Sequence, residues 1–138
     1  MNYPRAPWKD QPITSSGDTT IPAGAPNVEI IPWTPAPWTF PEAIDLRGVN
    51  THPTDPITIE LWGAFSATGP GSLIYSAAAD PSNNSAALGA LLSVEPAGTG
   101  KVAPMYPWPF LRVTASNAGA NDVVARAAIG VRNLVGGP

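Results

Sequence analysis

The sequence predicts an all-β protein: an antiparallel β-sandwich of jelly-roll or immunoglobulin-like type with a long, extended, proline-rich N-terminal arm. Three observations predict this class. Short runs rich in β-branched and apolar residues recur after residue 42 with turn-forming residues between them, strands do not alternate with helices, and half of the 18 prolines lie in residues 1–41. We therefore divide the chain into an arm, residues 1–41, and a sandwich domain, residues 42–138.

The spacing of the prolines predicts the arm. It leaves no gap long enough for an ordinary helix and removes hydrogen-bond donors from any central strand. Only residues 27–31 are suited to a short strand, which Pro32 would end. Aromatic residues lie beside the prolines, although disordered linkers are usually poor in them, so we expect these side chains to contact a partner. They are Tyr3, Trp8, Trp33, Trp38 and Phe40.

The sandwich domain begins with three predicted strands. Residues 43–48 alternate apolar with charged side chains and end at a glycine, and residues 72–77 form a strand after the turn of residues 69–71. Between them, residues 57–65 give the clearest strand, because Ile57, Ile59 and Leu61 share one face. Its other face carries Thr58, Glu60 and Trp62.

Residues 85–94 are ambiguous. A short helix capped by Asn84 or Ser85 would include several alanines and leucines, but Gly89 weakens it. A strand over residues 91–94 fits nearly as well, and we favour it slightly.

A β-hairpin is predicted near the end of the chain. Residues 110–115 and 122–132 are rich in β-branched and apolar residues, and residues 116–121 between them are turn formers. Alternation places Leu111, Val113 and Ala115 on one face, with Arg112 on the other, and gives the second run an apolar face opposite Arg126. Because a lone hairpin is marginal in water, further strands must cover it, which makes five or six in a sandwich or small barrel.

Composition limits the classes of partner. Charged residues make up 12% of the chain, about half of the usual fraction of roughly 25%, so part of the surface is either small and polar or covered by neighbouring molecules. The net charge of -3 gives no basic field for nucleic acid. No apolar run approaches a membrane span or the core of a signal peptide, so we expect no membrane partner and no export through the general secretory route.

No catalytic pattern is present, and we expect a protein that is not an enzyme. His52 is the only histidine, and no serine lies in a Gly-x-Ser-x-Gly elbow. Asp45 and Glu60 could form an acid and base pair, but carboxylates on strands more often face solvent. Asp80 and its neighbouring asparagines do not match a calcium loop, so neither a metal nor a cofactor is expected.

Aromatic side chains suggest a second class of function. Exposed rings on a β-sandwich can stack on sugars, and the candidates are Tyr106, Trp108, Trp62 and Phe110. Packing within the protein is the more common role for such rings. The alternative function is therefore a carbohydrate- or receptor-binding module.

The aromatic and proline residues before residue 110, the run Phe110-Leu111-Arg112-Val113-Thr114-Ala115, the glycine-containing turn and the final apolar strand resemble the C-terminal hairpin of small β-sandwich virion proteins of tailed bacteriophages. The strands at residues 44–48 and 57–61 fit the same pattern, so the resemblance covers roughly residues 42–132.

This resemblance implies a non-enzymatic capsid decoration (cement) protein, or another head or tail accessory. Its partners would be the major capsid protein and further copies of itself, in a homo-oligomer such as a trimer. It would be located in the virion, on the capsid surface, after assembly in the host cytoplasm. The five aromatic residues of the arm would then supply the contacts with the particle.

Overall fold

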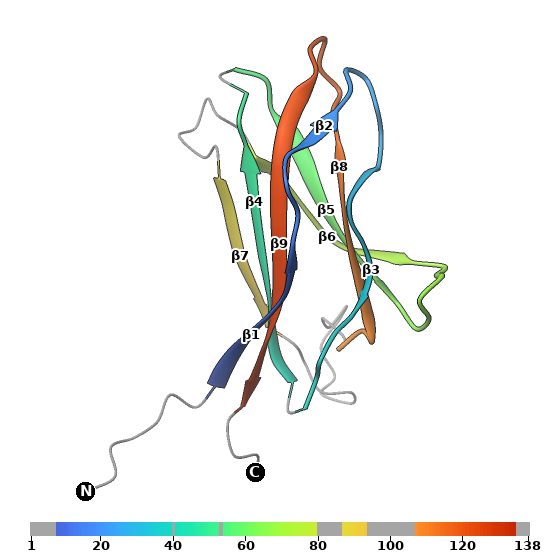
Figure 1. Cartoon of the computed structure of the whole chain (residues 1–138), viewed down its shortest axis with the longest axis vertical. Helices are drawn as coiled ribbons and strands as arrows, with labels where there is room; N and C mark the ends of the chain where they lie inside the picture. Colours follow the sequence, from blue (N-terminus) through green and yellow to red (C-terminus); the bar gives the residue numbers. More distant parts are fainter. Residues whose placement is uncertain (1–7, 40, 53, 80–86, 94–106, 135–138) are drawn as a thin grey trace, which may run out of the picture.

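The protein consists of two antiparallel β-sheets packed face to face, which confirms the predicted all-β class (Figure 1). The computed structural model describes residues 8–39, 41–52, 54–79, 87–93 and 107–134. Within these ranges the regular elements are all strands. None of the described residues form a helix that is long and apolar enough to cross a membrane.

The first sheet, called sheet A, has five strands in the order β1-β9-β4-β7, and β2 also pairs with β9. Its strands are β1 (Trp8–Ser15), β2 (Thr19–Ile21), β4 (Pro41–Asn50), β7 (Ala87–Ser93) and β9 (Val123–Leu134). The second, sheet B, has four strands in the order β3-β8-β5-β6. They are β3 (Val28–Pro35), β5 (Ile57–Ala64), β6 (Ser72–Ala79) and β8 (Phe110–Ser116).

The core lies between the sheets and is formed by alternate residues of their strands. In β5, Ile57, Ile59 and Leu61 are fully buried, as the sequence predicts, while the residues between them face outward. Strands β8 and β9 also confirm the predicted faces, since their apolar series are buried. Burial of aliphatic side chains from both sheets is the main favourable contribution to this fold.

The predicted N-terminal arm is wrong for the part of residues 1–41 that the structure describes. Strands β1 and β2 pair with β9, β3 pairs with β8, and Ile21, Ile30 and Ile31 are buried in the core. The boundary at residue 41 therefore does not separate two domains. Prolines exclude central strands, but an edge strand needs ladder donors on one side only, and β1 and β3 are both edge strands.

The predicted hairpin of residues 110–132 is also wrong in its pairing, although both of its strands exist. Strand β8 belongs to sheet B and β9 to sheet A, so residues 117–122 cross between the layers (Figure 1). The apolar faces of the two strands are packed against each other across the core rather than side by side. A connection of six residues is long enough to cross the roughly 10 Å between packed sheets.

The other predicted strands are confirmed. Residues 57–64 and 72–79 form a true hairpin, β5 and β6, around the predicted turn at residues 69–71. The ambiguous segment contains strand β7, which pairs with β4, so the helix alternative does not apply to residues 87–93.

Candidate functional site

Only two of the five arm residues predicted to contact a partner have side chains that the structure describes. Trp33 and Trp38 are both half-buried against their own chain. Trp8 lies in β1, where only the backbone is described, and Tyr3 and Phe40 lie outside the described residues.

Trp33 covers the outer face of sheet B. Its ring lies against Gly71, where an added Cβ would come within 2.5 Å of the indole. The guanidinium of Arg112 lies 5.8 Å from the Trp33 ring centroid, a cation–π distance, and its Nη2 is 3.8 Å from Oε2 of Glu29. This indole therefore bridges the edge strand β3 to the start of β6.

Trp38 and Trp108 lie together at the end of the sandwich where β8 begins. Nε1 of Trp38 donates a hydrogen bond of 3.0 Å to the Trp108 carbonyl, and both indoles pack against the core. The Trp108 ring rests on Gly63, and the Phe65 ring lies 5.0 Å away at a tilt of 49°. Trp108 thus has a packing role, whereas Phe65 is 67% exposed.

A chain of polar contacts covers the middle of the outer face of sheet B. Nε1 of Trp62 donates to the Thr114 hydroxyl at 2.7 Å, and Thr114 donates to Oε1 of Glu60 at 2.9 Å. Ser116 donates to the same oxygen at 2.9 Å. Trp62 is directly opposite Arg112, and Thr114 is two residues away from Arg112 along β8. Because the indole reaches Thr114 diagonally, it lies along the sheet surface instead of standing away from it.

The two carboxylates considered as an acid and base pair are not neighbours. Asp45 lies on the outer face of sheet A and holds Arg47 through two contacts of 3.2 and 3.3 Å, whereas Glu60 lies on the outer face of sheet B. Arg126 likewise pairs with Asp18 on sheet A at 3.4 Å and does not share a face with Arg112. The crossing from β4 to β5 separates Asp45 from Glu60, and the crossing from β8 to β9 separates Arg112 from Arg126.

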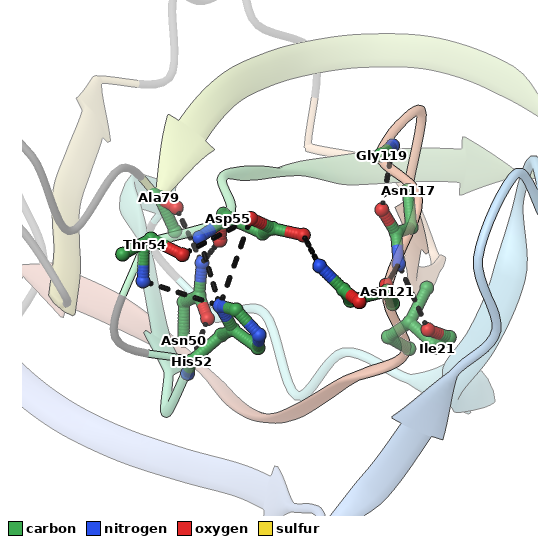
Figure 2. Close-up of polar contacts among 9 residues, drawn as sticks. All are labelled: Ile21, Asn50, His52, Thr54, Asp55, Ala79, Asn117, Gly119 and Asn121. Carbon is green, nitrogen blue, oxygen red and sulfur yellow. Dashed lines mark hydrogen bonds and ion pairs between the residues drawn. The ribbon is translucent and has the colours of Figure 1, made fainter.

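Figure 2 shows a polar cluster that joins two loops at one end of the sandwich. The start of β1 and the end of β9 lie at the other end (Figure 1). Asp55, in the β4–β5 connection, accepts hydrogen bonds from Thr54 at 3.2 Å and from the Asn121 amide at 3.0 Å. The bond from Asn121 is the main cause that lowers the pKa of Asp55 below its ordinary value. The carboxylate is therefore ionised at neutral pH and fastens the two loops together.

His52 belongs to this cluster as an acceptor. Its Nδ1 receives the backbone N–H groups of Thr54 at 3.1 Å and Asp55 at 2.8 Å (Figure 2). An imidazole nitrogen that accepts hydrogen bonds carries no proton, so the neutral ring is the form that fits these contacts. Nδ1 of His52 is therefore occupied in holding the loop backbone.

Three asparagines are buried in the described part of the chain, and each one binds backbone where the chain crosses between sheets. Asn50 donates to the carbonyls of Asp55 and Ala79, at 2.7 and 2.9 Å. Asn117 donates to Ile21 and Asn121 and accepts from Gly119, as Figure 2 shows. Asn133 accepts from the Thr39 amide and donates to the Pro37 carbonyl. These side chains supply hydrogen-bond partners for backbone groups in the connections, where the chain has left one sheet and has not yet joined the other.

A shallow pocket of about 280 Å³ lies on the outer face of sheet A. It is lined by Ser16 and by residues of β4 and β9, among them Arg47 and Arg126. Each guanidinium has a carboxylate beside it, Asp45 and Asp18 respectively, so the pocket offers no surplus charge that would select an anion. Among the described residues no three metal-ligating side chains gather in one place.

Sequence reasoning missed the role of the buried asparagines. The signal was present, because Asn50 and Asn117 each follow a predicted strand and begin a loop, a pattern typical of asparagines that bond to nearby backbone. Alternation cannot reveal which of these side chains turns inward, since that depends on the crossing between sheets.

No family model and no curated protein match this chain. Among solved structures, the fold is similar to the crystal structure of PirA, with a TM-score of 0.54. The match covers 83% of this chain and 92% of that chain, with 15% sequence identity. At such low identity this likeness concerns the fold alone.

Proposed function

We propose that this protein is a non-enzymatic structural protein of a phage particle, of the capsid decoration type. The main support is an exposed apolar surface on a chain with few charges. Phe65 is 67% exposed and Leu73 is 50% exposed, and they flank the turn between β5 and β6. Such side chains contribute to affinity when a partner removes them from water.

The arrangement of polar groups is consistent with this class. His52 and the Asp55 carboxylate of the loop cluster hold backbone and neighbouring side chains, which makes the body more rigid. A rigid sandwich loses little conformational entropy when it docks on a shell. The partners in this proposal are the major capsid protein and further copies of the chain, on the surface of a virion assembled in the host cytoplasm.

Cosedimentation with cognate empty capsids tests the proposal. The intact protein should bind saturably, and the double variant Phe65→Ser, Leu73→Ser should bind at least about tenfold more weakly, the equivalent of about 1.4 kcal/mol. Ala118→Ser, Ala120→Ser is the matched control, because both alanines are exposed in the turn between β8 and β9. Intact protein that stays in the supernatant at every capsid concentration would refute the proposal.

Trp62 favours a second candidate, the carbohydrate-binding module. Its indole lies along the outer face of sheet B with its N–H already bonded to Thr114, which leaves a ring face as the feature a sugar could stack on. A glycan array probed with the intact protein and with Trp62→Ala tests this role. Trp108→Ala is unsuitable for this test, because Trp108 packs against Gly63 and the core.

A further inference from the structure

The two sides of the sandwich differ in how their edge strands are protected. On one side, β1 contains Pro12 and a register shift, and β3 contains Pro32, Pro35 and two register shifts. Prolines and bulges are the devices by which natural sheets prevent other strands from pairing with an edge. This side of the molecule is therefore closed to further strands.

The other side has none of these devices along most of its length. It is formed by β6 and β7, the terminal strands of the two sheets, which contact each other. Neither strand contains a charged residue or a proline. In β6 the one register shift lies near its start, before Tyr75, so residues 75–79 form a regular ladder with β5.

Within the described residues, β6 pairs with no strand other than β5. Its residues from Ser76 to Ala78 are exposed or half-buried and have small side chains that leave the backbone accessible. An uncharged, exposed edge of this kind is a template for pairing with another strand. Such an edge normally has a partner in a protein that stays soluble at working concentration.

We infer that β6 pairs with β6 of a second copy of this chain, in antiparallel orientation about a two-fold axis. This arrangement joins two four-stranded sheets into one of eight strands. A second copy suits the edge because the same residues face each other across the axis, and with no charge in β6 no like charges meet. The protected opposite side prevents further addition, so the assembly closes as a dimer and does not grow into a filament.

The dimer deepens the proposed function and rests on it for its biological role. Antiparallel pairing would carry two copies of the surface formed by Phe65 and Leu73, one on each subunit, on a single rigid sheet. Two linked sites bind a repetitive shell more tightly than either alone. The inference also differs from a trimer, because a two-fold edge contact joins two subunits.

Charge substitutions on β6 test the pairing. In the double variant Ser76→Lys, Ala78→Lys, the new side chains occupy exposed positions and should not disturb the fold of a single subunit. Two-fold pairing, however, places lysines of the two copies close together. Light scattering after size-exclusion chromatography should show a dimer for the intact protein and a monomer for this variant. Ala118→Lys, Ala120→Lys adds the same charge in an exposed turn and should remain a dimer.

A mixing experiment separates loss of pairing from loss of folding. The variant Ser76→Glu, Ala78→Glu should also be monomeric, and an equimolar mixture with the lysine variant should return to the mass of a dimer. An intact protein that is monomeric at high micromolar concentration, a dimer that survives the lysine variant, or a mixture that stays monomeric would each overturn the inference. A dimer that does not bind capsids would refute the proposed function and leave the pairing intact.

Discussion

Gly63 and Gly71 allow two indole rings to lie directly on the backbone of sheet B. A Cβ at position 63 would overlap the Trp108 ring, and a Cβ at position 71 would come within 2.5 Å of the Trp33 ring. These glycines are needed for close approach, because an indole that covers a strand leaves no room for a side chain beneath it. The packing of both tryptophans thus depends on residues without side chains.

Gly63→Ala is expected to lower the free energy of unfolding by roughly 1 to 3 kcal/mol, the usual cost of forcing extra atoms into a packed site. Chemical denaturation followed by tryptophan fluorescence measures it. Gly17→Ala is the control, since nothing lies within 4 Å of an added Cβ there, and its effect should stay within about 0.5 kcal/mol. Equal effects at both positions would show that Trp108 does not lie on Gly63.

Asp55 should make stability depend on pH in the acidic range. Hydrogen bonding by Asn121 lowers the pKa of Asp55 in the folded state, so ionised Asp55 stabilises the fold above the unfolded pKa of about 3.9. That contribution is lost as pH falls through the lowered folded pKa. The thermal midpoint of the intact protein should exceed that of Asp55→Asn at neutral pH, and the difference should narrow in acid. A difference that is the same at every pH would contradict this account.

At the scale of the element, neighbouring residues determine whether a strand forms and which face it buries, but they do not determine which strand it pairs with. Alternation in residues 57–61 and 110–115 correctly predicted strands and their buried faces, because the period of two depends only on neighbouring residues. The pairing of β8 and β9 was missed, since a run of turn formers between two strands fits a hairpin and a crossing between sheets equally well. The prolines of residues 1–41 were read as leaving room for one short strand only, residues 27–31, although they exclude only central strands.

Asn117 should be more important to the fold than its place in a turn suggests. Its side chain makes three hydrogen bonds, to Ile21, Gly119 and Asn121, in the two connections that cross near it. Asn117→Ala leaves backbone groups without partners and should lower the free energy of unfolding by about 2 to 3 kcal/mol. Asn121→Ala is the comparison, because this exposed side chain bonds only Asp55 in the described contacts, and urea denaturation should show a smaller loss.

At the scale of the whole molecule, the first forty residues complete both sheets. Without them β9 would lose β1 and β2, β8 would lose β3, and the core would lose Ile21, Ile30 and Ile31. A fragment of residues 42–138 is therefore expected to be unfolded or aggregated by circular dichroism and light scattering. The sequence-based division into arm and domain predicts a folded fragment, so the experiment decides between the two descriptions.

The candidate surfaces could be predicted only in part. The sequence singles out aromatic residues as contacts, but it does not show that Trp33 and Trp38 contact their own chain while Phe65 is exposed. Exposure depends on which strands are neighbours, and therefore on the same pairing that alternation leaves open. The contacts predicted for Tyr3, Trp8 and Phe40 remain predictions.

Amide hydrogen exchange on the intact protein tests most directly whether the N-terminal strands belong to the body of the fold. Strand β3 pairs with β8 through Val28, Glu29 and Ile31, so these amides should be protected to an extent that approaches the amides of β8. The account predicts slow exchange in both strands under conditions where the fold is stable. Exchange of residues 28–31 at the rate of an unstructured chain, beside a protected β8, would contradict it.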